Sequence, residues 1–127
     1  MGREIVRTAE APGSDGRLPY SQAVKAAGLV FVSGQAPTDP GGTVVGETIG
    51  EQTRQCLRNV EAILRAAGSS IDRVVSATFI LRDADDFAGF NEEWVRWFAT
   101  DPPARQGAKH PFNLPTMRIS IAVIAEA

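Results

Sequence analysis

The stretch that decides the fold is LPYSQAVKAAGLVFVSGQAP, residues 18–37. It predicts two strands, residues 19–26 and residues 29–32, because the first is moderately apolar and the second is a run of β-branched and aromatic residues. Ala27 and Gly28 lie between these runs and suit a tight turn. A β-hairpin is therefore the element from which we work outward.

The second strand of this hairpin runs into Ser33 and Gly34. A glycine at a strand end lets backbone N–H groups approach a ligand closely, and Ser33 adds a hydroxyl beside them. Patterning alone also allows an ordinary hairpin with a bulge at its end. Both interpretations stay open at this point.

Two helices are predicted beyond the hairpin. Thr48 and Glu51 have the spacing of a capping box, and the helix that they open is expected to end at Ala67, before a glycine. Cys56 falls on its apolar stripe, so we interpret it as a small buried hydrophobe. In the second helix, Asn91 lies within a stripe of aromatic residues, where its amide either has a buried partner or turns to solvent: Phe87, Phe90, Trp94, Trp97 and Phe98.

Further strands are predicted at residues 4–8, 74–81, 104–110 and 118–125. The order of elements indicates an α+β fold, a single mixed β-sheet with both helices packed on one face. We expect one domain over residues 1–127. Strand 74–81 is apolar on both alternating faces, so subunits of an oligomer are expected to cover the face that the helices leave free.

Hydrophobic residues make up 43% of the chain and charged residues 22%, ordinary proportions for a globular domain. The net charge of −2 and the lack of a basic run argue against nucleic acid or a membrane surface as partner. One cysteine and one histidine exclude an internal disulfide and argue against a structural zinc. With no signal-peptide core and no membrane-length apolar run, we expect a cytoplasmic protein.

Four segments together resemble the YjgF/RidA family, in that family's own order: PYSQAVKAAGLVFVSGQAP, EQTRQCLRNVEAILRAAGSSIDRVV, DDFAGFNEEW and PPAR. The resemblance implies a chorismate-mutase-like α+β subunit in a homotrimer, with ligand clefts between neighbouring subunits. In deaminase members these clefts hydrolyse reactive imines and enamines such as 2-aminoacrylate, giving a 2-oxo acid and ammonia. The resemblance implies no metal and no organic cofactor.

The family's motif residues match five positions of this chain: Tyr20, Ser33, Gly34, Asn91 and Arg105. The resemblance implies that Arg105 binds the carboxylate of a small substrate. A guanidinium suits this role because it holds a carboxylate with two parallel hydrogen bonds. Ser33, the Gly34 N–H and Tyr20 are candidates for steadying charge during catalysis, and Gly34 and Asn91 for binding substrate.

Two positions depart from the deaminase pattern. Gly107 stands where a cysteine is usual, two residues after the arginine. The last strand reads ISIAVIA, which places Ala122 where the resemblance implies a glutamate that handles the attacking water. Candidates to replace it are His110, Ser120 and Lys109, although a surface histidine, a packed hydroxyl and a solvated lysine are the favoured interpretations. Lys109 is expected on the Arg105 face of its strand, and Ser120 on the Ala122 face.

The function predicted from these residues is hydrolytic deamination of an imine or enamine at an atypical site. One alternative is a non-catalytic trimeric binder of small 2-oxo or amino acids, which needs Arg105 but no water-handling group. Another is a different reaction on a specialised-pathway substrate, using His110 or Ser120. RNA cleavage is the least favoured, because the charge balance is acidic.

Overall fold

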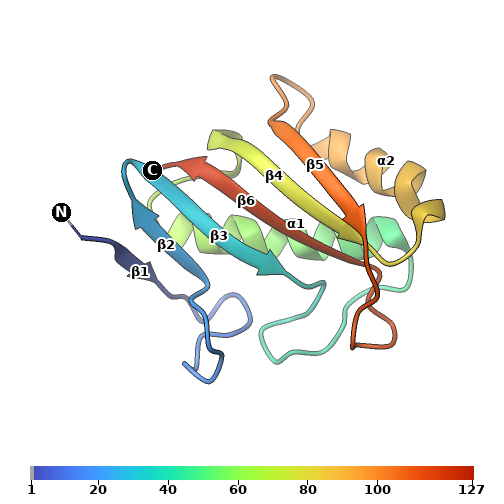
Figure 1. The fold of residues 1–127 in the computed structure, drawn as a ribbon, viewed down its shortest axis with the longest axis horizontal. Coiled ribbons are helices and arrows are strands. Elements are labelled where there is room, and N and C mark those ends of the chain that lie inside the picture. Colours follow the sequence, from blue (N-terminus) through green and yellow to red (C-terminus); the bar gives the residue numbers. More distant parts are fainter. Residues whose placement is uncertain (1) are drawn as a thin grey trace.

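The computed structural model describes residues 2–127, and within them one sheet of six strands carries two α-helices on one face (Figure 1). The predicted α+β architecture is confirmed. In chain order the elements are β1 (Glu4–Val6), β2 (Ala23–Ala26), β3 (Leu29–Gln35), α1 (Ile49–Ala66), η1 (Ile71–Arg73), β4 (Val74–Leu81), η2 (Ala84–Asp86), α2 (Phe87–Trp97), β5 (Ala104–Lys109) and β6 (Ile119–Glu126).

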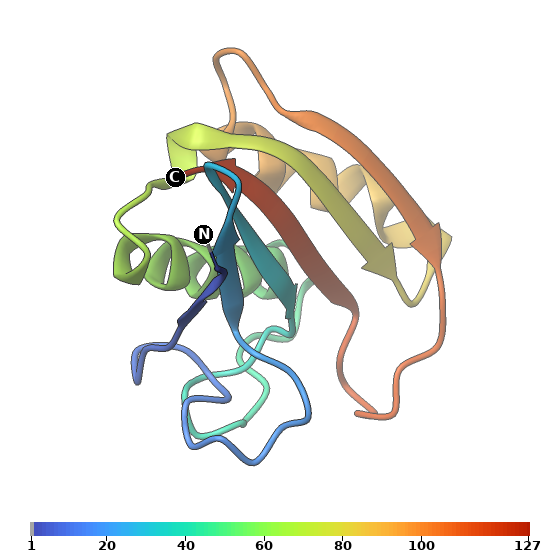
Figure 2. The same cartoon turned by 60° about the vertical axis from the view of Figure 1, so that its left-hand side comes forward.

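The strands lie in the order β1-β2-β3-β6-β4-β5. Neighbouring strands are antiparallel except β4 and β5, which are parallel and are connected through η2 and α2. Strand β5 is thus an edge strand, and both β6 and β4 separate it from β3. Figure 2 shows β5 and α2 on one side of the molecule and the β2–β3 hairpin on the other.

The predicted hairpin is present, with Ala23 opposite Val32 and Ala26 opposite Leu29. Ala27 and Gly28 both have positive φ angles, 55° and 77°, as a two-residue turn requires if its twist is to match that of the flanking strands. The sequence-based interpretation placed the turn correctly.

The start of the first hairpin strand was predicted wrongly, because β2 begins at Ala23 and not at residue 19. Pro19 has no N–H to give to a sheet. The Gln22 side chain is instead used to hold the preceding loop: its Nε2 donates to carbonyl oxygens of Thr8, Ala11 and Pro12 at 2.8–3.1 Å. Residues 19–22 therefore belong to this loop.

Helix α1 begins with the predicted capping box. Thr48 Oγ1 accepts a hydrogen bond from the Glu51 N–H at 3.1 Å, and Glu51 Oε1 accepts one from the Thr48 N–H at 3.0 Å. The helix ends at Ala66, one residue before the predicted end. Cys56 is fully buried, and burial raises the pKa of its thiol, so its interpretation as a buried hydrophobe is confirmed.

Helix α2 packs Phe90 and Trp94 against the sheet, as predicted. Phe87 was assigned to the same stripe, but as the first residue of the helix it lies at the rim and is 45% exposed. The buried Glu93 accepts a hydrogen bond from Arg54 Nη2 at 3.1 Å, which connects α2 to α1.

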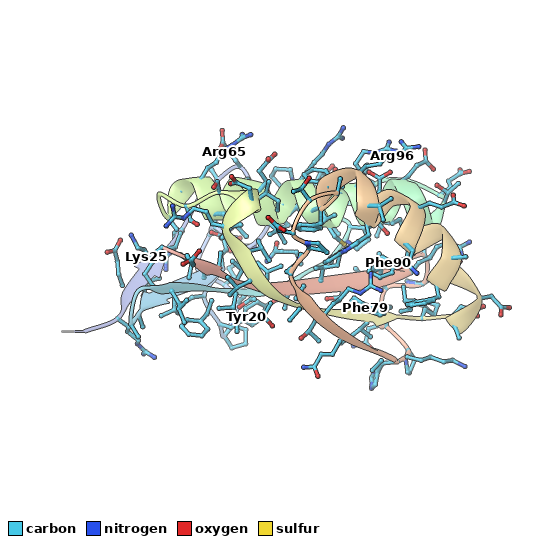
Figure 3. The ribbon with its side chains drawn as sticks, turned by 90° about the horizontal axis from the view of Figure 1, so that it is seen from above. Tyr20, Lys25, Arg65, Phe79, Phe90 and Arg96 are labelled. Atoms are coloured by element: carbon cyan, nitrogen blue, oxygen red, sulfur yellow. The ribbon has the colours of Figure 1, made fainter. Side chains whose placement is uncertain are left out.

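The two faces of the sheet differ sharply. In β4 the side chains of Ala77, Phe79 and Leu81 are buried beneath the helices. On the opposite face Phe31 and Val75 remain 40% and 42% exposed. Both helices lie on the other side of the sheet (Figure 3). We call this helix-free side the open face. None of the helices formed by the described residues has the length and apolar character needed to span a membrane.

Candidate functional site

Arg105 lies on β5, opposite Ala77 of β4, so its side chain projects on the helix-covered face beneath α2. Its Nη1 donates a hydrogen bond to Asn91 Oδ1 of α2 at 2.8 Å. The amide within the aromatic stripe therefore has a partner, which decides between the two interpretations of Asn91. This bond fixes the orientation of the guanidinium plane.

Aromatic rings surround the Arg105 guanidinium. Its Cζ lies 5.0–5.6 Å from the centroids of four rings, which we call the aromatic box: Phe79, Phe87, Phe90 and Trp94. Ring faces carry partial negative charge, so they stabilise the cation without neutralising it. Sequence analysis missed this box, since its members come from β4 and α2 and were interpreted as core.

Arg105 has no acidic partner among residues 2–127: none of the ion pairs there includes it. Its side chain is partly buried, and burial lowers the pKa of Arg105 from its ordinary value. An arginine stays protonated despite such a shift. A partly dehydrated cation without a counter-ion is a suitable binding site for an anion.

Two hollows lie along β5, and Arg105 lines the first of them. One encloses about 760 Å³ and is lined by Asn91, Trp94, Pro102 and Arg105 itself, with other residues of the same segments. The other encloses about 340 Å³ and lies along the end of β5. We call the second one the Gly107 hollow, because Gly107 forms part of its wall.

Tyr20 and Gly34 lie together elsewhere, in a hollow of about 270 Å³ near the end of β3. Tyr20 is 56% exposed, and Figure 3 shows it on the open side of the sheet, away from Phe79 and Phe90. The Ser33 Oγ donates to the Ser21 carbonyl at 2.7 Å, so its proton is already in use. In this arrangement the Ser33 oxygen is available to a ligand as an acceptor, and its part in steadying charge stays a prediction.

Ser33 and Gly34 form the bulge that the hairpin pattern allowed, since the β3–β6 register shifts between Val32 and Gln35. Ala122 of β6 falls at this shift. A Cβ atom built on Gly34 would lie 3.1 Å from Ser120 Oγ. Ser120 and Ala122 are thus on the open face beside the Gly34 bulge, as the predicted alternation requires.

The remaining candidates lie near the end of β5. Lys109 is exposed and lines the Gly107 hollow on the Arg105 face of the strand. His110 is also exposed; its Nδ1 lies 2.7 Å from the Pro111 carbonyl, and its backbone N–H donates to the Leu81 carbonyl. This environment is that of the surface loop histidine favoured from sequence. No group of three or more His, Cys, Asp or Glu side chains in residues 2–127 is placed to hold a metal ion.

Arg105 with Asn91 forms one group of candidate residues, and Tyr20 with Gly34 forms the other. We call these two groups the half-sites, and they do not meet within one chain. Strands β6 and β4 lie between β3 and β5, so Gly34 and Arg105 are separated by about three strand spacings, roughly 14 Å. Arg105 also projects on the helix face, whereas Gly34 faces Ser120 on the open face. A small ligand that contacts both half-sites therefore requires a second copy of the chain.

Comparison with known proteins agrees with this architecture. Residues 8–127 match the family model described as endoribonuclease L-PSP. A RutC family protein of Saccharolobus solfataricus is 42% identical over 125 residues, 98% of each chain. The chloroplastic Reactive Intermediate Deaminase A of Arabidopsis thaliana is 41% identical, over 97% of this chain and 65% of that protein.

Solved structures give the same result. The crystal structure of E. coli TdcF with bound serine matches with a TM-score of 0.87 and 32% identity, over 98% of each chain. Fold and sequence thus define an α+β subunit of the endoribonuclease L-PSP type. The chain belongs to the YjgF/RidA family.

Proposed function

We propose that this protein is a RidA-like hydrolase that converts a 2-imino acid, or its enamine tautomer, to a 2-oxo acid and ammonia in a homotrimer. The observation that carries the proposal is Arg105: a partly buried guanidinium, oriented by Asn91 and free of any carboxylate partner within residues 2–127. A substrate carboxylate supplies the missing counter-charge.

The reaction divides among the residues as follows. Arg105 binds the carboxylate and so orients the adjacent C=N group. Water adds to the imine carbon, both its hydrogens pass to the nitrogen, and ammonia leaves while the oxygen stays as the carbonyl. Tyr20 and the Gly34 N–H, from the neighbouring subunit, stabilise the developing charge as hydrogen-bond donors.

Water is handled without a carboxylate at position 122. The Ser120 hydroxyl lies beside Gly34 on the same face and is the candidate to orient the water. Imines already react with water, so the barrier that the protein must lower is modest. Losing one acid–base group lowers the rate by about 10²–10⁴-fold and does not abolish catalysis.

The relatives support this proposal. The Arabidopsis protein is named a reactive intermediate deaminase, and the E. coli structure holds serine, a small molecule with a carboxylate. The family model also carries an endoribonuclease description, but a net charge of −2 gives RNA phosphates little attraction. We keep the cytoplasm as the proposed location.

One observation favours a second function. The absence of a carboxylate at Ala122 suits a non-catalytic trimeric binder of 2-oxo or amino acids, which uses Arg105 alone. The two functions differ in turnover. The assay generates 2-aminoacrylate enzymatically and follows pyruvate: a hydrolase accelerates its appearance, and a binder does not.

The anchoring role is tested by titrating pyruvate or 2-oxobutyrate into wild type, Arg105→Lys and Arg105→Ala. Lysine keeps the charge but loses the two-pronged geometry, so we expect affinity to fall about tenfold or more with Arg105→Lys and further with Arg105→Ala. Arg96→Lys is the matched control, since the Arg96 side chain on the same side of the molecule is 71% exposed. Equal affinities for all variants rule the role out.

A further inference from the structure

Gly107 lies on the same face of β5 as Arg105, two residues further along the strand and opposite Phe79 of β4. A Cβ atom built on Gly107 would lie 2.2–2.5 Å from three atoms of the Phe79 ring. No real Cβ tolerates such distances. A side chain at this position would force the Phe79 ring to move, so the glycine is what allows the ring to lie here.

The Phe79 ring also lies close to Phe90 and Arg105. Its centroid lies 4.5 Å from that of Phe90 and 5.0 Å from the Arg105 Cζ. Lying across Gly107, the ring extends the aromatic box from α2 to the edge strand. Because Gly107 has no side chain, the Phe79 ring can present an aromatic surface at this position, beside the Arg105 guanidinium.

This aromatic surface forms one wall of the Gly107 hollow. Phe79, Leu81, Ala84 and Phe87 supply apolar walls, and Lys109 is the charged residue that lines it. Phe79 and Phe87 also belong to the aromatic box, and their ring centroids lie 5.0 and 5.6 Å from the Arg105 Cζ. Phe79 and Phe87 thus line the hollow and also lie beside Arg105, so the hollow begins about one side-chain length from the proposed carboxylate position.

We propose that the Phe79–Gly107 pair makes the Arg105 site selective for 2-imino and 2-oxo acids with a branched or aromatic apolar side chain. The carboxylate binds Arg105, and the side chain packs on Phe79 and Phe87 in the Gly107 hollow. A substrate as short as 2-aminoacrylate leaves this apolar surface in water. This inference rests on the proposed function and adds the substrate class to it.

The test is calorimetric titration of the wild-type protein with pyruvate, 4-methyl-2-oxopentanoate and 2-oxoglutarate. Each apolar carbon that becomes buried strengthens binding about fourfold, so we expect the branched acid to bind about tenfold tighter than pyruvate or better. A preference for 2-oxoglutarate overturns the inference, because it assigns the hollow to a second carboxylate near Lys109.

Variants link the preference to the glycine. Gly107→Ala forces the Phe79 ring out of its place, and we expect the affinity ratio of branched acid to pyruvate to fall to about threefold or less. Gly50→Ala is the matched control, since the atom nearest to its added Cβ is Thr48 Oγ1 at 4.0 Å, and it leaves the ratio unchanged. Phe79→Leu removes the ring without adding a clash, and tests the same ratio if Gly107→Ala fails to fold.

The outcomes separate this inference from the proposed function. Equal affinities for pyruvate and the branched acid, both lost in Arg105→Ala, overturn the substrate class but leave the anchoring role intact. Binding that does not depend on Arg105 overturns both. A third result is an affinity ratio of branched acid to pyruvate that stays high in both Gly107→Ala and Phe79→Leu. That result assigns the preference to another part of the site and overturns the inference.

Discussion

At the scale of single residues, Arg105 is a partly buried cation that has no acidic partner among residues 2–127. A charge loses solvation on burial, and proteins ordinarily offset that loss with a counter-ion. Here Asn91 and four aromatic rings offset it only in part, because neither kind of group is an anion. We propose that a carboxylate ligand supplies the counter-charge that Arg105 lacks within residues 2–127.

We predict that Ala122 is the residue at which enzyme and binder diverge. It lies at the bulge of β3, on the same face as Ser120, where the family resemblance implies a carboxylate. Ala122→Glu is expected to raise 2-aminoacrylate hydrolysis about 10²-fold or more, the ordinary contribution of an acid–base group. The measurement is pyruvate formation with 2-aminoacrylate generated enzymatically.

The larger side chain has to fit, since overpacking costs about 1–3 kcal/mol of stability. A thermal melt of the variant is therefore the control. A folded Ala122→Glu protein of unchanged oligomeric state and without a gain in rate contradicts the proposed imine hydrolysis at this position. If the wild-type protein already hydrolyses 2-aminoacrylate rapidly, another group positions the water. Ser120 is then the first candidate, and His110→Ala is the next variant to make.

At the scale of elements, Glu93 connects the two helices. Burial acts to raise the pKa of its carboxyl, but hydrogen bonds from Arg54 and Trp97 outweigh burial and hold the pKa below its ordinary value of 4.5. A lowered pKa in the folded state stabilises the protein above pH 4.5. That contribution is lost as the pH falls from 4.5 through the folded-state pKa.

Glu93→Gln keeps the shape of the side chain but removes its charge. We expect a loss of about 1.5–3 kcal/mol at neutral pH, the range for hydrogen bonds to charged groups. We also expect a smaller loss of stability than in wild type when the pH falls below 4.5. Urea denaturation at several pH values measures both, and parallel pH profiles for the two proteins refute the assignment.

Local signals explain which elements were predictable. The hairpin turn at Ala27–Gly28 and the capping box of Thr48 and Glu51 each depend on residues within four positions of one another. The start of β2 was missed because Gln22 bonds a loop more than nine residues away. Long-range contacts leave no mark on local periodicity.

The candidate site follows the same division. Arg105, Asn91, Tyr20 and Gly34 were found through family motifs, but their arrangement as two separate half-sites depends on the strand order. The role of Phe79 was not predicted, because aromatic residues at such spacing ordinarily form core. Gly107 within a strand was the one local signal that another group approaches closely.

At the scale of the whole molecule, a second copy of the chain would serve two purposes. It would cover the open face, and it would bring the two half-sites together. Phe31 and Val75 are 40% and 42% exposed on this face, which also carries the Gly34 half-site. We predict a homotrimer in which each subunit covers the open face of a neighbour. Light scattering coupled to size exclusion is expected to give about three times the subunit mass of 13.6 kDa. A monomer at micromolar concentration refutes the trimer and the shared site together.

We propose that each ligand site combines Arg105 of one subunit with Tyr20 and Gly34 of another. The most direct measurement mixes two defective variants, Arg105→Ala and Tyr20→Ala, by co-expression and titrates a 2-oxo acid into the mixed oligomers. Tyr20 is 56% exposed, so its truncation leaves the fold intact. Random assembly of equal amounts is expected to restore about a quarter of the sites, because each intact half is present with even odds. If each site lies within one chain, or if Tyr20 takes no part in it, the mixture only averages the two variants, and no sites beyond that average are restored.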